Sequence, residues 1–237
     1  MKHVRKYLPI LLVLLLALGM AGCGSSGGDT GDAGAASSSS ASEDTSADTS
    51  ADTGTDSAES VEYEHGTIDG TVYTNDFFGF TFSVKDDWTF TDEKGLRELN
   101  QSVSDLLDND SITNALKEGQ TFIDMQASSG DDSFSSINLT VSYAPGSTGI
   151  GDITDATTEY MKSMYENAGF ENIEISKETA AVSGGTLDTL VTKMTVEGID
   201  VVEKQFFFTN GDYLGTLTVS GMSEEECDEL LSWITLK

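Results

Sequence analysis

The chain has 237 residues, of which 41 are acidic and 12 basic, and its formal net charge at pH 7 is −29. A charge of this sign and size repels phosphate polymers, so we expect no nucleic-acid partner. With two cysteines, two histidines and two prolines, the sequence lacks the residues for a disulfide scaffold, a Cys/His metal cluster or a proline-rich ligand. The length favours a single folded domain.

The first residues have the pattern of a signal peptide. Three basic residues lie between Met1 and Lys6, and an almost wholly apolar run extends from Leu8 to Leu18. A permanent transmembrane helix needs ~20 apolar residues, so this run favours an export signal over a membrane span. We therefore expect residues 1–22 to be a removable leader.

The end of this leader resembles the lipobox of bacterial lipoproteins. The lipobox residues are Met20, Ala21, Gly22 and Cys23. The resemblance implies that the Cys23 thiol receives a diacylglycerol, carrying acyl chains such as palmitate, and becomes a membrane anchor. Two or three acyl chains, at about 0.8 kcal/mol per buried methylene, give stable anchoring. The alternative is an ordinary cleaved signal in which Cys23 is incidental.

Residues 23–64 are expected to form a disordered acidic tether. From Gly24 to Ser60 the chain uses only Gly, Ser, Ala, Thr, Asp and Glu, and residues 24–64 hold ten acids and no base. Such a segment buries too little apolar surface to offset its ordering entropy. A flexible chain of this length spans roughly 35 Å. We interpret it as a spacer between the membrane and a folded body.

Residues 65–237 are predicted to form one globular domain. Its first strand is indicated by the alternating Phe78, Phe80, Phe82 and Val84. Asp86 and Asp87 are expected to form a turn that precedes Trp88. A helical region that closes at Gly119 follows, marked by Leu96, Leu99, Val103, Leu106 and Leu107.

A hairpin and a second helix are predicted next. One hairpin strand is marked by Ile123, Met125 and Ala127, and the other by Ile137, Leu139, Val141 and Tyr143. The helix runs from about Asp155 to Gly169. Its apolar face is expected to hold Tyr160, Met161, Met164, Tyr165 and Ala168, as core rather than as a cofactor site.

The last third predicts an antiparallel meander followed by a helix. Turn sequences separate four strand-like runs, 173–182, 186–196, 199–209 and 212–220, and Asn210-Gly211 suits a type I′ turn. Ser223 and Glu226 form a predicted capping box. The helix behind it carries Cys227, Leu230, Leu231 and Ile234 on one stripe, so we interpret Cys227 as a core residue rather than a reactive thiol.

The sequence provides little catalytic equipment, and we predict no enzyme, no catalytic residue and no cofactor. The only histidine after the leader is His65, beside the tether, and no nucleophile-elbow, phosphate-loop, zincin or dinucleotide motif occurs. Composition leaves a Ser–Lys pair open. Three acidic pairs could hold a cation: Asp108 with Asp110, Asp131 with Asp132, and Asp152 with Asp155. None has the ligand spacing of an EF-hand loop. We therefore interpret them as solvated surface charge and assign no metal ligand. Asn138 matches a glycosylation acceptor inside a predicted strand and is taken as chance.

The run from Tyr73 to Trp88, YTNDFFGFTFSVKDDW, resembles the opening of PsbP-like domains. In that pattern an aromatic-Gly-aromatic strand leads into a short acidic turn and a tryptophan. The resemblance implies an α+β fold, a PsbP-like α/β sandwich in which helices flank a central antiparallel sheet. It also implies an extracytoplasmic module that binds or helps to assemble other proteins, without a shared catalytic set. Phe80 and Trp88 are assigned to the core.

Two functions follow as expectations. The first is a lipid-anchored extracytoplasmic lipoprotein that binds a protein or cell-envelope partner without catalysis. The second is a lipoprotein that binds a small ligand or a cation such as Ca²⁺. An exposed apolar patch on the folded domain would favour the first. The partner's identity and the oligomeric state are left open by the sequence.

Overall fold

The structure is a computed structural model, and it describes residues 61–85, 87–101, 108–130 and 135–237. The expected leader, the lipobox with Cys23 and the tether up to residue 60 lie outside the described residues. So do Asp86 of the predicted turn, Val103, Leu106 and Leu107 of the predicted helix, and the acidic pair Asp131 and Asp132. No helix of the described part of the chain is long and apolar enough to span a membrane.

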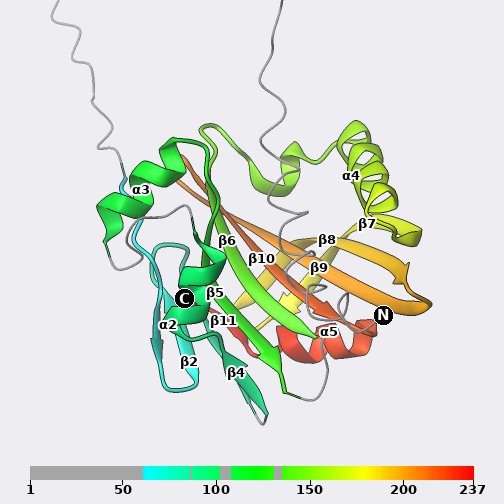
Figure 1. The fold of residues 1–237 in the computed structure, drawn as a ribbon, viewed down its shortest axis with the longest axis horizontal. Coiled ribbons are helices and arrows are strands. Elements are labelled where there is room, and N and C mark those ends of the chain that lie inside the picture. The colour runs from blue at the N-terminus through cyan, green and yellow to red at the C-terminus, as the bar shows by residue number, and fades with distance from the viewer. Residues whose placement is uncertain (1–60, 86, 102–107, 131–134) are drawn as a thin grey trace, which may run out of the picture.

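The larger of two sheets has seven antiparallel strands in the order β4-β5-β6-β10-β9-β8-β7 (Figure 1). Four of them, β7 to β10, are consecutive in the chain and form the predicted meander. The strands are β4 (Trp88–Phe90), β5 (Phe122–Ser129), β6 (Ser136–Tyr143), β7 (Glu171–Val182), β8 (Gly185–Val196), β9 (Ile199–Asn210) and β10 (Tyr213–Gly221). The predicted fold class, antiparallel sheet with flanking helices, is therefore confirmed.

A second, smaller sheet has four strands in the order β1-β2-β3-β11. These are β1 (Thr67–Asp69), β2 (Val72–Asn75), β3 (Phe80–Ser83) and β11 (Ile234–Leu236). Phe80 and Phe82 alternate along β3 as the sequence predicted, and both are fully buried. β11 pairs with β3, so the two ends of the described chain meet in one sheet.

Five helical segments lie in the described ranges of the chain. They are α2 (Glu93–Leu99), α3 (Asn109–Lys117), the 3-10 helix η2 (Gly149–Asp152), α4 (Asp155–Asn167) and α5 (Glu224–Leu231). Four of them begin at side-chain caps, Asp92 for α2, Asp108 for α3, Thr154 for α4 and Ser223 for α5. Each cap accepts a hydrogen bond from a first-turn backbone N–H that would otherwise lack a partner.

The large sheet is packed on both faces. Val191 belongs to the main core, which the small sheet, α3 and α5 form against the larger sheet. Its neighbour Leu190 belongs to a second core beneath α4 and η2. Because successive side chains of a strand point to opposite faces, the two cores lie on opposite sides of β8. This three-layer packing is the sandwich that the sequence predicted.

Several sequence predictions need correction. Phe78 lies in the turn before β3, and the helical stretch that ends at Gly119 contains two separate described helices, α2 and α3. Tyr160 is 55% exposed and does not share the buried face of α4 with Met161 and Tyr165. Ile234 is buried, but it belongs to β11, because the chain leaves the helix at Ser232 and turns back to pair with β3.

The type I′ turn is also at a different hairpin from the one predicted. Asn210 is the last residue of β9, and of the two residues between β9 and β10 only Gly211 has a positive φ, of 57°. At the β8–β9 hairpin, both Glu197 and Gly198 have positive φ, 52° and 80°. Two consecutive positive φ values are what the type I′ turn requires. Asn210 instead donates its side-chain N–H to the backbone oxygen of Phe77, at 2.8 Å.

Candidate functional site

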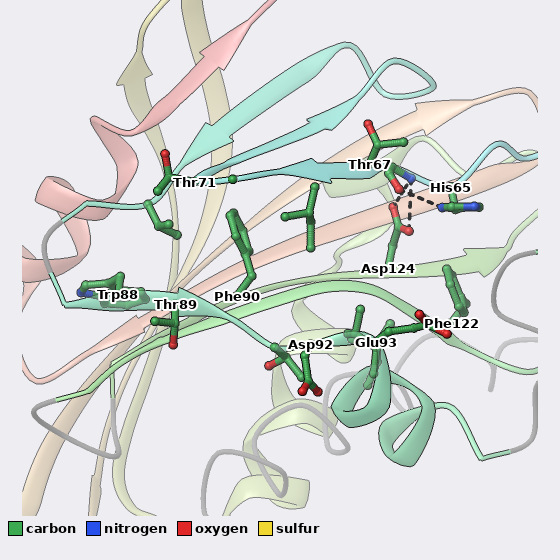
Figure 2. A pocket seen from close by; sticks show the side chains of 17 residues that line it. His65, Thr67, Thr71, Trp88, Thr89, Phe90, Asp92, Glu93, Phe122 and Asp124 are labelled. Atoms are coloured by element: carbon green, nitrogen blue, oxygen red, sulfur yellow. Dashed lines mark hydrogen bonds between the residues drawn. The ribbon is translucent and has the colours of Figure 1, made fainter.

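A groove of about 660 Å³ opens between the outer strands of the two sheets (Figure 2). β1 and the turn after it line one side, and β4 with the start of α2 lines the other. Both β1 and β4 are terminal strands of their sheets. The groove is thus a gap between two strand edges, which the close-up shows with Phe90 projecting from β4 toward the small sheet.

The groove combines an apolar lining with a polar, acidic rim. Its apolar side chains are Ile68, Val84, Trp88, Phe90, Leu96, Phe122 and Ile123. Asp92 and Glu93 are exposed at one end of β4, and the described residues that line the groove include no lysine or arginine. Ile68 is 41% exposed, which is high for an isoleucine. Exposed apolar surface of this kind is typical of binding grooves.

One end of the groove is closed by a buried carboxylate, Asp124. It accepts hydrogen bonds from the backbone N–H of Gly66, at 2.9 and 3.2 Å, from the Nδ2 of Asn75, at 3.0 Å, and from the hydroxyl of Tyr73. A carboxylate that is taken out of water needs such donors, since an unpaired buried charge is costly. Burial and the nearby Asp124 raise the pKa of Tyr73 well above its usual value, so Tyr73 stays a neutral donor.

Gly66 is required for this closure. A Cβ atom at residue 66 would lie 2.3 Å from the hydroxyl oxygen of Tyr73, a distance that the packed ring cannot accommodate without moving. Asn75 supports the cluster from β2, donating to the Tyr73 hydroxyl at 2.9 Å and accepting from the N–H of Phe78 at 2.7 Å. The Asp124 carboxylate accepts its hydrogen bonds from Gly66, Tyr73 and Asn75 of the protein itself. We therefore interpret Asp124 as a structural residue.

Asp124 was missed by the sequence analysis because of a β-bulge. Ile123, Met125 and Ala127 alternate with polar residues, which places Asp124 on the opposite face from Met125. In the structure the register of β5 against β6 shifts between Ile123 and Met125. The extra residue turns the Asp124 carboxylate toward Tyr73 of the small sheet. A single acidic residue inside an apolar strand run was the one available signal.

Of the other residues that the sequence analysis named, some line the groove and some are buried away from it. His65 lines the groove, with its Nδ1 2.8 Å from the backbone oxygen of Gly66. Trp88, expected in the core, is half-buried and also lines the groove, with its ring centroid 5.5 Å from that of Trp233. Asn138 lies in β6 with its side chain buried, as its strand assignment predicted. Phe80 lies in the core.

One carboxylate of each acidic pair in the described residues accepts hydrogen bonds from nearby backbone N–H and hydroxyl groups. Asp108 caps α3 through the N–H and hydroxyl of Ser111, and these bonds lower the Asp108 pKa. Asp152 accepts from Ser147 and Thr148, and its pKa is lowered by those bonds. Within the described ranges, no group of three or more His, Cys, Asp or Glu residues is placed to hold a metal ion.

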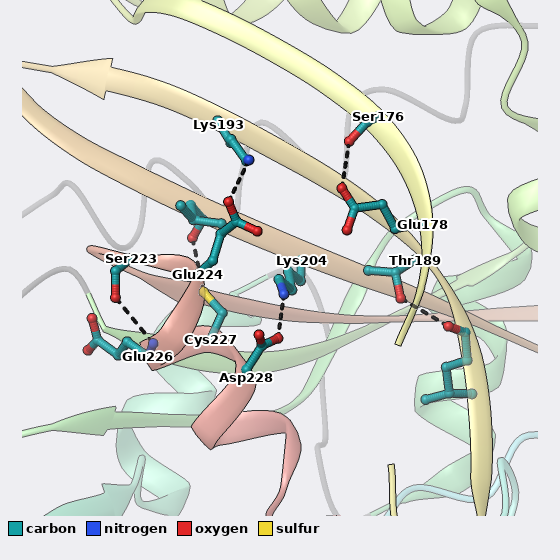
Figure 3. A network of polar contacts seen from close by, with 12 residues as sticks. Ser176, Glu178, Thr189, Lys193, Lys204, Ser223, Glu224, Glu226, Cys227 and Asp228 are labelled. Atoms are coloured by element: carbon teal, nitrogen blue, oxygen red, sulfur yellow. Dashed lines mark hydrogen bonds and ion pairs between the residues drawn. The ribbon is translucent and has the colours of Figure 1, made fainter. Parts of the chain in front are cut away.

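A second polar cluster joins α5 to the large sheet (Figure 3). Lys204, whose side chain is almost fully buried, pairs with Asp228, and Lys193 pairs with Glu224 at the surface. Between them the Cys227 thiol contacts the backbone oxygen of Val202 at 3.4 Å. Burial raises the pKa of Cys227 to about 12, so the thiol is protonated and unreactive at neutral pH, in agreement with its interpretation as a core residue.

Comparisons with known proteins indicate similarity in fold only. No protein-family profile and no curated protein matches the sequence. The solution structure of cyanobacterial PsbP (CyanoP) from Synechocystis sp. PCC 6803 is 16% identical, with a TM-score of 0.43, over 73% of this chain and 98% of that one. A crystal structure from Bacteroides thetaiotaomicron VPI-5482 is 11% identical, with a TM-score of 0.33, over 67% of this chain and 45% of that one. The fold class rests on the strand pairings given above.

Proposed function

We propose that this chain is a lipid-anchored extracytoplasmic lipoprotein whose folded body binds a protein or cell-envelope partner without catalysis. The observation that carries the binding role is the groove between β1 and β4, which has an apolar lining at the surface. The anchoring role is supported by the basic and apolar leader and by the lipobox, Met20 to Cys23. A tether built only from Gly, Ser, Ala, Thr, Asp and Glu between Gly24 and Ser60 would let the body reach partners away from the bilayer.

Anchoring is tested by the substitution Cys23→Ala in the producing cells. The wild-type protein is expected in the membrane fraction, with a purified N-terminus that is heavier by its acyl chains. Cys23→Ala is expected to leave the membrane fraction, because the lipobox then has no thiol to acylate. As the matched control, Cys227→Ala changes the other cysteine and is expected to stay with the membrane. Retention of Cys23→Ala in the membrane, or an unmodified wild-type N-terminus, would contradict the anchor.

Partner binding is tested by photo-crosslinking in intact cells. A photoreactive residue introduced at Thr89, an exposed position in the groove, is expected to capture a partner. The same residue at Glu159, which lies on the exposed surface of α4, is the control position. Equal capture at both positions, or none at either, would contradict a binding role for the groove.

The alternative function, cation binding, has weaker support. In each described acidic pair one carboxylate already accepts hydrogen bonds from the fold, Asp108 at the cap of α3 and Asp152 in the loop before α4. A calcium site would need several free oxygen ligands converging on one point. Calorimetry of the purified full chain with Ca²⁺ separates the two functions, and saturable heat at millimolar Ca²⁺ would favour the alternative.

A further inference from the structure

The terminal strands of the two sheets differ in how their open edges are protected. β7 carries charged residues along its length, among them Glu174, Lys177 and Glu178, which disfavour pairing with another chain. The outer edge of β11 is occupied by Ser183. The N–H of Leu236 donates to the backbone oxygen of Ser183 at 2.8 Å, and Thr235 forms a β-bridge with Ser183. By contrast, β4 consists of Trp88, Thr89 and Phe90 and has no charged side chain.

The backbone of β4 offers hydrogen-bonding groups to the groove. The N–H of Thr91 donates to the backbone oxygen of Gln126 on β5, at 2.8 Å. Residues of an antiparallel strand alternate between pointing toward the partner and away from it. The N–H and C=O of Phe90 therefore point away from β5, toward the side on which β1 lies. In the described part of the chain no strand pairs with β4 on that side.

The charge of the groove restricts what can occupy it. Asp92 and Glu93 follow one residue after the C-terminal end of β4, and among the described residues that line the groove only His65 has a basic side chain. In a protein with a net charge of −29, an acidic segment would be repelled from this edge. A segment with a lysine or arginine would be attracted to the end of β4 that carries Asp92 and Glu93.

We propose that an extended segment of a partner protein binds in this groove by pairing antiparallel with β4. The occupant would carry apolar side chains at alternate positions, directed at Trp88 and Phe90, and a basic residue at its N-terminal end. Antiparallel pairing places that end beside Asp92 and Glu93. Backbone hydrogen bonds would supply part of the affinity, and the alternate apolar positions would supply specificity. This inference rests on the proposed binding function and specifies its site and its ligand class.

The first test measures binding of defined peptides to the purified full chain. The probe is a blocked hexapeptide, Lys-Thr-Val-Thr-Val-Thr, and its two controls are the reversed sequence and a version with Glu in place of Lys. Binding is followed by calorimetry and by tryptophan fluorescence, which comes from Trp88 in the groove and from Trp233 beside it. The probe is expected to bind about fivefold more tightly than the reversed peptide and more tightly still than the Glu version. Equal affinity for all three would overturn the proposal.

Two pairs of variants locate the peptide. Glu93→Lys is expected to weaken binding about fivefold, whereas Glu98→Lys, on the outside of the same helix, is expected to leave it unchanged. The two are matched, since Glu93 pairs with Arg97 and Glu98 with Lys94, both at the surface. An equal effect of both substitutions would contradict the placement of the basic residue.

The second pair separates side-chain contact from strand pairing. Phe90→Ala removes the ring and keeps the N–H, while Phe90→Pro removes both. Because this N–H makes no ladder bond with β5, proline costs the fold no hydrogen bond at this position. Phe90→Pro is expected to bind about tenfold more weakly than Phe90→Ala, with similar circular dichroism spectra for the two. Equal affinities of the two variants for the peptide would rule out strand pairing with β4. A failure of the wild-type groove to crosslink any partner at Thr89 in cells would instead contradict the proposed binding function.

Discussion

Glu203 and Asp124 show how differently a buried carboxylate can be accommodated. Asp124 accepts hydrogen bonds from three separate groups. Glu203, in the middle of β9, accepts one, from the Tyr165 hydroxyl of α4 at 3.3 Å, and its Oε2 has no partner in the described part of the structure. Burial therefore raises the Glu203 pKa to about 8, and the bond from Tyr165 offsets this only in part.

This shift predicts a pH-dependent loss of stability that Glu203→Gln removes. The ordinary pKa of a glutamate side chain, 4.5, applies to the unfolded chain, so between pH 4.5 and 8 the unfolded state has released a proton that the folded state still holds. Folding stability must then fall as pH rises across this window, and the penalty is complete above pH 8. Glutamine, which stays neutral, avoids the penalty while keeping an oxygen for Tyr165.

Urea unfolding of the wild type and Glu203→Gln from pH 4 to pH 9 tests this prediction. The free energies of unfolding are expected to be similar near pH 4, with the variant gaining by roughly 1.4 kcal/mol per pH unit within the window. Subtracting the two curves removes the contribution of the other acidic residues, which both proteins share. Parallel curves would mean that Glu203 is ionised in the folded state.

At the scale of elements, the hairpins of the meander depend on two-residue turns of different geometry. The β8–β9 turn has Glu197 in the left-handed region, at φ 52°. A residue with a Cβ atom pays a steric cost there that glycine does not. The β9–β10 turn places only Gly211 in that region, and its second residue, Asp212, has no positive φ.

We predict that Glu197→Gly stabilises the protein by about 0.5–1 kcal/mol, because the relief of strain exceeds the added flexibility of the unfolded chain. Asp212→Gly is the matched control, as the second residue of an equally short turn. It is expected to destabilise, since it adds unfolded-state entropy and removes the acceptor of the Tyr143 hydroxyl, 3.2 Å away. Midpoints of thermal unfolding compare the two, and a lower midpoint for Glu197→Gly would contradict the prediction.

The sequence predicted those elements whose signal is local and repeated. The four strands of the meander, the hairpin of β5 and β6, and the cap of α5 at Ser223 follow from alternation, turn residues and capping, which act within a few residues. Ile234 has the spacing of a helical residue but pairs with Phe82, more than a hundred positions earlier. Nothing near Ile234 in the chain indicates that pairing.

The candidate site was less predictable than the fold for the same reason. The groove exists because β1 and β4 end two different sheets, and the order of strands in a sheet is a long-range property. Trp88 was assigned to the core from its aromatic character, and only the packing of the two sheets leaves it half-exposed. The bulge that turns Asp124 inward likewise depends on the register of β5 against β6.

For the molecule as a whole, the structured body begins before residue 65. Tyr63 is fully buried in the main core, and its ring centroid lies 5.0 Å from that of Phe77 and 5.8 Å from that of Tyr213. It therefore joins the turn before β3 to the start of β10. Val61, two residues earlier, is 47% exposed and lies over Gly211. The last residues of the expected tether thus belong to the packed domain.

We predict that Tyr63→Ala lowers the free energy of unfolding of the full chain by about 3 kcal/mol, the usual cost of removing a buried aromatic ring. Tyr63→Phe keeps the ring and is expected to change stability far less, while Val61→Ala, at an exposed position, is expected to have little effect. Denaturant unfolding of the three variants measures these differences. If Tyr63→Ala and Val61→Ala were equally stable, the body would begin after residue 63 and the ring would contribute nothing to it. A large loss for Tyr63→Ala alone would show that the segment before residue 65 contributes a packed residue to the core.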